Sequence, residues 1–243
     1  MPTPPAIVDV IIPAYNEEAS IALVVHEIPR RWTLGDTDVR VRDVIVCNNN
    51  SRDRTREVAA AAGAVVVDEQ RPGYGSACLK GMAYIAARPQ AQWPDVVAFV
   101  DGDHSDYPEQ LPELVNPIVT GRAGLVIGSR ALGELEPGSM QPQQIFGNWL
   151  ATSLIKLIYG DEFTDLGPFR AIRYRTLRTL GMQDPDFGWT VEMQVKGARE
   201  GLRCAEVPVD YRGRAAGHSK VSGSLKNSVL AGEKILRTIF THS

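Results

Sequence analysis

Two aspartates separated by one glycine carry the chemistry that this sequence most strongly suggests. Asp101, Gly102 and Asp103 follow the apolar run 96–100, which is typical of a strand buried on both faces of a sheet. Two carboxylates at this spacing can share one hard divalent cation, and the glycine lets a ligand approach closely. A solvated acidic turn would have the same local sequence, so other segments must decide between the two.

Polar segments also follow three other predicted strands. The strands are predicted over 7–12, 42–47 and 64–67, and the polar segments over 13–18, 48–55 and 68–76. A helix is expected after each polar segment, and the repeated units predict a right-handed, mostly parallel α/β sheet flanked by helices. Because ligands bind at the carboxyl ends of strands in such sheets, we expect one shared crevice there.

Such a crevice has groups for both a nucleotide and a metal. Donors in the loops can hold the nucleotide, the two aspartates a metal, and a basic loop near 211–220 the phosphate charge. This combination predicts transfer of a group from a nucleoside-diphosphate donor, with the metal neutralising the leaving group. The loop from Gly73 to Gly75 can lay backbone amides against a phosphate, although a simple turn would look the same.

The second half of the chain is richer in helices. Strands are predicted over 125–130 and 204–209, a polar loop over 133–142, and helices over 144–159, near 174–180, up to about 200, and over 224–240. The helix at 144–159 fits either the core or a membrane surface. The last helix fits the domain, a second subunit or a membrane surface, so a homodimer and a peripheral membrane contact both stay open.

Composition narrows the class of protein. The 26 basic and 29 acidic residues give a net charge of −3, which leaves no electrostatic footprint for nucleic acid. Cys47, Cys78 and Cys204 form no C-x-x-C pair and fit a reducing cytoplasm. No apolar run approaches the roughly 18 residues of a membrane span, so we expect a cytoplasmic chain that can also lie on the inner face of the membrane.

The order of these motifs resembles that of family 2 glycosyltransferases with the GT-A fold. Segments 11–18, 48–55 and 101–103 match its successive signatures, and 101–109, 128–130, 165–170 and 214–220 resemble the dolichyl-phosphate mannose synthase and polyprenyl-phosphate glycosyltransferase branch. The resemblance implies one domain over 1–243. It divides into a nucleotide-binding half (about 7–131), an acceptor half (about 132–222) and a C-terminal amphipathic helix (223–243).

The resemblance also implies a function and a role for each matched residue. It implies inverting transfer of a hexose from a UDP- or GDP-linked sugar, in the presence of Mg²⁺ or Mn²⁺, to an acceptor such as a polyprenyl phosphate. The donor would be held by Pro13, Ala14, Tyr15, Glu17, Asn49, Ser51, Gly75, Asp101 and Gly102, and its diphosphate by Arg214, Ser219 and Lys220. The metal would be held by Asp101, Asp103 and Ser105, and the acceptor by Arg130 and Arg170.

Two of these positions depart from the family pattern. Asn49 stands where the family usually has an aspartate near the base, and Ser105 where the branch usually has a glutamine. They leave open the nucleobase and a serine contact to the metal. They also prompt the alternative of a module that binds a nucleotide sugar without turnover. A nucleotidyltransferase is disfavoured because 13–18 is not a glycine- and lysine-rich loop.

The catalytic base, if one exists, is predicted to be Asp165 or Glu192. A hydroxyl acceptor must lose a proton during attack, so one of these carboxylates would then take it. A phosphate acceptor is already ionised and needs positioning, in which case Arg130 and Arg170 matter more. The alternatives are a turn or helix cap for Asp165 and a solvated helix residue for Glu192. Both kinds of acceptor, lipid phosphate and soluble hydroxyl, stay open.

Overall fold

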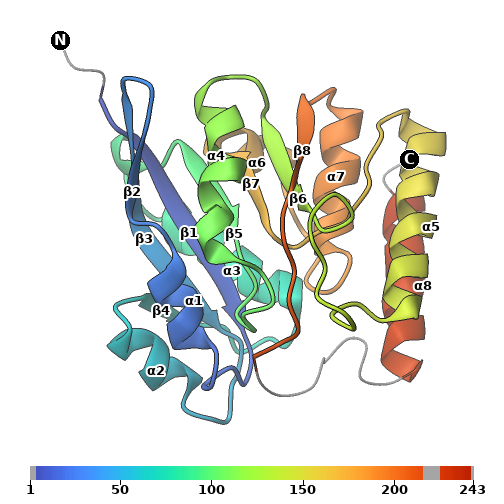
Figure 1. The fold of residues 1–243 in the computed structure, drawn as a ribbon, viewed down its shortest axis with the longest axis horizontal. Helices are drawn as coiled ribbons and strands as arrows, with labels where there is room; N and C mark the ends of the chain where they lie inside the picture. The colour runs from blue at the N-terminus through green and yellow to red at the C-terminus, as the bar shows by residue number, and fades with distance from the viewer. Residues whose placement is uncertain (1–3, 216–224, 242–243) are drawn as a thin grey trace.

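The computed structural model describes residues 4–215 and 225–241, which fold around one central sheet (Figure 1). Its strands are β1 (Ala6–Ala14), β2 (Arg31–Leu34), β3 (Thr37–Asn48), β4 (Val65–Asp68), β5 (Val96–Phe99), β6 (Leu125–Ser129), β7 (Arg170–Arg173) and β8 (Cys204–Pro208). They are ordered β2-β3-β1-β5-β7-β6-β8, and β4 also pairs with β3. The β1–β3, β1–β5, β3–β4 and β6–β8 pairs are parallel and the β2–β3, β5–β7 and β6–β7 pairs antiparallel, so the predicted α/β fold is confirmed and its sheet is mixed.

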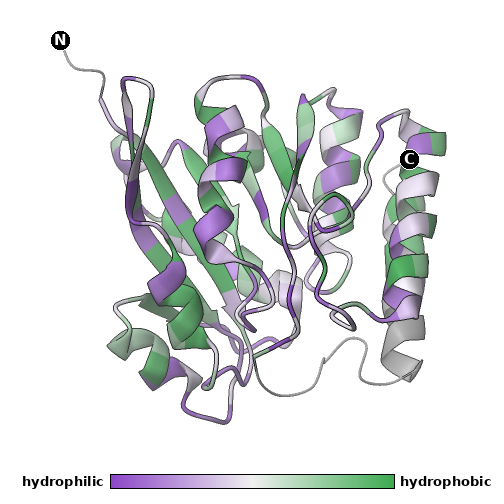
Figure 2. Cartoon of the chain, in the orientation of Figure 1, coloured by the Kyte–Doolittle hydropathy of each residue, from purple (hydrophilic) through white to green (hydrophobic). Residues whose placement is uncertain are grey.

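Helices cover both faces of the sheet. They are α1 (Ile21–Glu27), α2 (Thr55–Ala61), α3 (Tyr74–Ala86), α4 (Leu111–Val119), α5 (Pro142–Tyr159), α6 (Tyr174–Leu180), α7 (Trp189–Arg199) and α8 (Leu225–Thr241), with short 3₁₀ turns at Gln90–Gln92 and Pro108–Gln110. Apolar residues of α1, α2 and α4 pack on one face, and those of α3 and α5 to α8 on the other. Figure 2 shows hydrophobic strands between helices that carry hydrophilic residues. The carboxyl edge of the strands is therefore where a ligand can reach them.

Strand β7 was not predicted, and it runs antiparallel to both of its neighbours, β5 and β6. Its four residues include two arginines, which is too short an apolar run to indicate a buried strand. The Arg170 side chain is fully buried because it donates to the backbone carbonyls of Gly167 and Thr190. This reversed strand brings the segment before it, with Asp165, to the carboxyl edge of β5 and β6.

The hairpin of β2 and β3 is a second difference from the prediction. The strand predicted over 42–47 begins at Thr37, and β2 pairs antiparallel with its first residues. Gly35 makes the turn with a φ of 57°, in the left-handed region that favours glycine. Strand β2 alternates exposed and half-buried residues, as expected for a strand at the edge of a sheet.

The C-terminal helix packs against the domain, which was one of its three predicted environments. Helix α8 contacts α5 and α7, and its Ile239 is fully buried. The Tyr159 hydroxyl at the end of α5 donates to the carbonyl of Ile239 at 2.7 Å. Phe240, by contrast, remains 57% exposed.

Candidate active site

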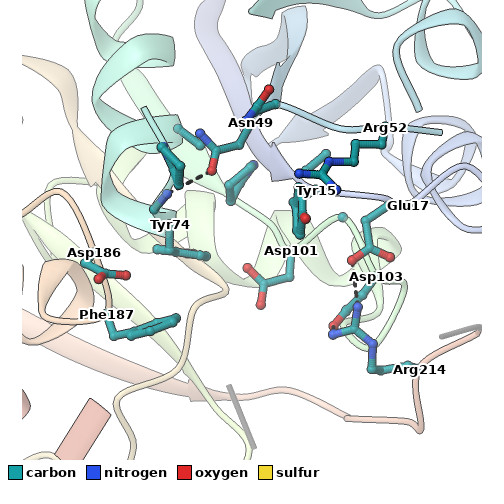
Figure 3. A pocket seen from close by; sticks show the side chains of 17 residues that line it. Tyr15, Glu17, Asn49, Arg52, Tyr74, Asp101, Asp103, Asp186, Phe187 and Arg214 are labelled. Carbon is teal, nitrogen blue, oxygen red and sulfur yellow. Dashed lines mark hydrogen bonds and ion pairs between the residues drawn. The ribbon is translucent and has the colours of Figure 1, made fainter. Parts of the chain in front are cut away.

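A cavity of about 510 Å³ opens at the carboxyl edge of the sheet. The predicted residues that line it are Pro13, Ala14, Tyr15, Glu17, Asn49, Asp101, Gly102, Asp103 and Arg214. They lie at the end of β1 or in the segments that follow β1, β3, β5 and β8, so the polar segments after these strands do meet in one crevice. Figure 3 shows Tyr15, Asp101 and Asp103 close together in it, with Arg214 beside Asp103.

Other predicted residues lie outside the cavity wall. They are Ser51, Gly75, Ser105, Arg130, Asp165, Arg170 and Glu192. The predicted diphosphate residues Ser219 and Lys220 lie outside the described residues.

Ser51 holds the loop after β1 in place. Its Oγ accepts a hydrogen bond from the backbone N–H of Asn16 at 3.0 Å, and Asn16 Oδ1 accepts one from the N–H of Arg52 at 2.8 Å. The N–H of Glu17 donates to Thr55 Oγ1 at 2.8 Å. These bonds join the loops after β1 and β3, which together form one wall of the cavity.

The side-chain amide of Asn49 both donates and accepts hydrogen bonds, which an aspartate at this position could not do. Its Nδ2 donates to the carbonyl of Arg71 at 2.7 Å, while its Oδ1 accepts from the N–H of Gly73 at 2.9 Å. A carboxylate at this position could accept but not donate. Asn49 therefore fastens the loop after β4 while still facing the cavity.

The glycines at the start of α3 allow a close approach of the backbone near Pro185. A Cβ on Gly75 would lie 2.0 Å from the carbonyl oxygen of Asp184, and one on Gly73 would lie 2.2 Å from that of Pro185. The N–H of Ser76 donates to the Pro185 carbonyl at 2.7 Å. The first turn of α3 is therefore already engaged by protein, and contact of Gly75 with the nucleotide stays a prediction.

Some buried side-chain oxygen atoms in the acidic turn after β5 lack a hydrogen-bond partner among the described residues. Asp101 Oδ1, Ser105 Oγ and Asp106 Oδ1 have no hydrogen-bond partner among the described residues. Burial, and then the charges of Asp103 and Asp106, raises the pKa of Asp101 well above its usual value. Burial, and then the charge of Asp103, raises the pKa of Asp106 to about 7.

These unpartnered oxygens suit a hard divalent cation. A cation beside Asp101 and Asp103 would relieve their repulsion, and oxygen atoms are the ligands that Mg²⁺ and Mn²⁺ prefer. Within residues 4–215 and 225–241, no three His, Cys, Asp or Glu side chains are grouped to hold a metal by themselves. The remaining ligands would therefore come from a bound diphosphate or from water.

The pKa of Asp106 predicts how pH affects stability. A carboxyl with a pKa of 3.8 unfolded and about 7 folded holds its proton more tightly in the folded state. The free energy of unfolding therefore falls as pH rises between these values. In EDTA we expect a lower Tm at about pH 8 than at about pH 5.5, and a smaller difference in Asp106→Asn. Asparagine can still accept the N–H of Asp101, and an unchanged pH slope in the variant would contradict this assignment.

Arg130 and Asp165, predicted to act separately, form one ion pair. Arg130 Nε and Nη2 donate to Asp165 Oδ2 and Oδ1, both at 2.7 Å, and the N–H of Arg130 donates to Oδ2 at 2.9 Å. The Asp165 side chain is 1% exposed, and the guanidinium of Arg130 lies 5.1 Å from the ring centre of Tyr211. With both carboxylate oxygens occupied, Asp165 is arranged to orient Arg130.

Glu192 and Arg170 lie in the framework behind the cavity. Glu192 accepts hydrogen bonds from the N–H groups of Gln183 and Asp184 and pairs with Lys196 at 2.7 Å. These bonds hold the loop that precedes α7. Burial lowers the pKa of Arg170 to about 10. The predicted roles of Glu192 as base and Arg170 as acceptor ligand stay predictions.

The cavity is also lined by residues that sequence analysis did not assign to it, among them Arg52, Tyr74, Asp186 and Phe187. Tyr74 packs edge-on against Trp189, with ring centres 6.1 Å apart. The sequence signal that could have identified this part of the cavity is an aromatic residue near the start of each of two predicted helices, Tyr74 for one and Phe187 for the other. Their meeting depends on the contact between the start of α3 and the loop before α7, which are far apart in the sequence.

A mixed α/β sheet with an acidic pair at its carboxyl edge is the architecture of GT-A glycosyltransferases. The chain belongs to glycosyltransferase family 2, because the model of glycosyl transferase family 2 matches residues 9–181. It is 35% identical over 226 residues to an uncharacterized glycosyltransferase of Mycobacterium tuberculosis, covering 92% of this chain and 94% of that one.

Two further proteins extend the comparison. An undecaprenyl-phosphate mannosyltransferase of Micrococcus luteus is 31% identical over 225 residues, covering 88% of this chain and 87% of its own. The crystal structure of glucosyl-3-phosphoglycerate synthase from Mycobacterium tuberculosis with Mn²⁺, uridine diphosphate and phosphoglyceric acid has the same fold. It matches with a TM-score of 0.72 at 24% identity, covering 98% of this chain and 78% of that chain. The protein is thus a glycosyltransferase, as predicted.

Proposed function

We propose that this glycosyltransferase moves a hexose, with inversion, from a UDP- or GDP-linked donor to a polyprenyl phosphate, and that it uses Mg²⁺ or Mn²⁺. The observation that carries the donor half is the acidic turn, whose Asp101 and Asp103 line the same cavity as the loops after β1 and β3, with Asp101 Oδ1 unpartnered among the described residues. The glucosyl-3-phosphoglycerate synthase has been solved with uridine diphosphate and Mn²⁺, and also with Mg²⁺, which supports a metal in this fold.

Each part of the cavity has a task in this proposal. Tyr15 and Asn49 lie where a base and ribose would be held, and Asp101 and Asp103 would hold the metal. The metal would neutralise the charge that grows on the diphosphate leaving group. The carboxylates of Asp101 and Asp103 are fixed by the turn after β5, so no rearrangement of the strands is needed.

A phosphate acceptor is supported by Arg130. The Arg130 side chain is 12% exposed, and Asp165 holds its guanidinium in one orientation. A phosphate oxygen is already ionised, so it needs an arginine to position it and no base to activate it. The name of the Micrococcus luteus relative, an undecaprenyl-phosphate mannosyltransferase, also supports this class of acceptor.

A lipid tail is supported by apolar residues near that arginine. Ile145, Phe146 and Trp149 on the first turns of α5 are 52%, 59% and 60% exposed. Asn148 on the same turns donates to the carbonyl of Thr164 and accepts from the N–H of Leu166, the two neighbours of Asp165. No helix in the described part of the chain has the length and apolar character of a membrane span. The contact that we propose with the inner face of a membrane is peripheral and is made through this end of α5.

Turnover of donors tests the proposal directly. We expect the purified protein to release UDP or GDP from one of a panel of nucleotide hexoses only when Mg²⁺ or Mn²⁺ and a polyprenyl phosphate are both present. EDTA should abolish the release, and the anomeric configuration of the product, read by NMR, should be inverted. Transfer to a soluble hydroxyl compound but not to the lipid would contradict the proposed lipid acceptor. Binding of a nucleoside diphosphate without turnover of any donor would overturn the transfer itself.

Vesicle sedimentation tests the membrane contact. We expect Phe146→Ser with Trp149→Ser to lose binding to vesicles that contain anionic lipid, because both rings lie on the exposed side of α5. Leu157→Ser is the matched control, since Leu157 is 81% exposed on the same helix but lies near its C-terminal end, away from the first turns that carry Phe146 and Trp149. Equal loss in both variants, or no binding by the unmodified protein, would contradict contact through the start of α5.

A further inference from the structure

Arg214 holds two acidic side chains of the cavity at once. Its Nη1 lies 2.6 Å from Asp103 Oδ2, and its Nη2 lies 2.6 Å from Glu17 Oε1 (Figure 3). Asp103 is also one of the two carboxylates expected to bind the metal. The guanidinium therefore occupies an oxygen that a divalent cation would need.

The backbone that carries Arg214 is fixed by contacts that do not involve its side chain. The neighbouring Arg212 donates from Nε to the carbonyl of His104 and from Nη2 to Glu27 Oε2, both at 2.8 Å. The N–H of Arg212 donates to the carbonyl of Ser105 at 3.0 Å. A change of partner by Arg214 thus requires only rotation of its side chain.

Arg214 neutralises only part of the negative charge around it. Asp101, Asp103 and Asp106 crowd the turn after β5, and repulsion among them contributes to the raised pKa values of Asp101 and Asp106. Arg214 Nε is buried without a hydrogen-bond partner among the described residues. One guanidinium therefore neutralises part of the acidic turn and keeps a donor that these contacts do not use.

We propose that Arg214 is the resting counter-ion of the acidic turn, and that a divalent cation displaces it from Asp103. The inference rests on the proposed function, because it takes the metal and a nucleoside diphosphate as ligands of this cavity. Two cations at one carboxylate oxygen repel each other. The diphosphate that arrives with the metal offers new acceptors to the released N–H groups. Metal binding is thereby disfavoured until the donor is present.

Binding of Mn²⁺ to the protein without nucleotide tests the exchange. We expect Arg214→Met to bind Mn²⁺ about tenfold more tightly than the unmodified chain, as measured from the electron paramagnetic resonance signal of free Mn²⁺, because a competing charge is gone. Arg52→Met is the matched control, since Arg52 lines the same cavity and its loss changes the net charge equally. It should change the affinity by less than about twofold, as expected for a charge that does not contact Asp103.

Nucleotide affinity should change in the opposite direction. With Mn²⁺ saturating, Arg214→Met should bind UDP or GDP about tenfold more weakly in calorimetry, because a charge-assisted donor to the diphosphate is lost. A variant that merely loses structure would bind both ligands more weakly. Arg214→Gln, which keeps a polar side chain, should repeat both changes if Arg214→Met proves unstable in thermal unfolding.

Each outcome decides one of the two proposals. Equal, weaker or unmeasurable Mn²⁺ binding by folded Arg214 variants would overturn the exchange, even if glycosyl transfer is observed. Tighter Mn²⁺ binding without transfer from any donor would support the exchange and overturn the proposed activity.

Discussion

Replacing Asp103 with asparagine is expected to lower kcat by about a thousandfold or more, because the charge that holds the metal at the leaving group is lost. The change should leave the fold intact. Asp103 lies in a turn at the edge of the sheet, and an asparagine Oδ1 can still accept the N–H of Ser105 at the position of Asp103 Oδ1. The measurement is the rate of donor turnover at saturating Mn²⁺, together with the Tm in EDTA.

Asp68→Asn is the control for this prediction. Asp68 also lies at the carboxyl edge of the sheet, but it pairs with Arg56 on the surface and does not line the cavity. Its loss should change turnover by less than about twofold, as is usual for exposed ion pairs. If Asp103→Asn were as active as Asp68→Asn, metal-assisted departure of the diphosphate at this turn would be wrong.

The second large effect is expected at the Arg130–Asp165 pair. Arg130→Met should lower kcat/KM for a polyprenyl phosphate by about a hundredfold, because truncating one partner of a buried, hydrogen-bonded ion pair typically costs a few kcal/mol. Asp165→Asn should have a similar effect, since its amide N–H₂ would face a guanidinium donor and release Arg130. The effect should appear mainly in the KM for the acceptor.

The double variant separates positioning from base catalysis. If Asp165 acts only by orienting Arg130, Arg130→Met with Asp165→Asn should be no worse than either single variant. If Asp165 is a general base, its loss should instead collapse kcat and remove the acidic limb of the pH profile, and the two effects should add. Glu192→Gln, which changes the group that holds the loop before α7, is expected to alter stability more than the acceptor KM.

The donor half of the site was readable from the sequence because its signals are local. β-Branched runs identified β1, β3 and β5, and Tyr15, Asn49 and Asp101 stand just after them, at a position that the parallel pairing of these strands determines. Strand β7 was not readable, because four residues with two arginines carry no strand pattern, and only tertiary contacts to buried carbonyls make Arg170 acceptable in the core.

Contacts between residues that are far apart in the sequence also could not be predicted from it. The prediction treated Arg130 and Asp165 as independent groups, and nothing in their types indicates that they pair across 35 positions. Asn49 was interpreted as the loss of a charge, whereas its hydrogen bonds to the loop after β4 explain why an amide stands at this position. In both cases the role of the side chain depends on the group to which it hydrogen-bonds, and the fold determines which group that is.

The reversed direction of β7 has a consequence for how such enzymes diversify. The segment from 130 to 169 leaves the sheet after β6 and returns before β7 at the same edge, where the N–H of Gly128 donates to the carbonyl of Phe169 at 2.8 Å. Both ends of this segment thus lie at one edge of the sheet, and its residues 134–136 also hydrogen-bond to Tyr211 and Gly213, next to the Arg214 that contacts Asp103. On the proposed assignment of Arg130 and Asp165 to the acceptor, we expect a chimera that exchanges this segment between relatives to change the acceptor more than the donor, provided that residues 134–136 keep their contacts with Tyr211.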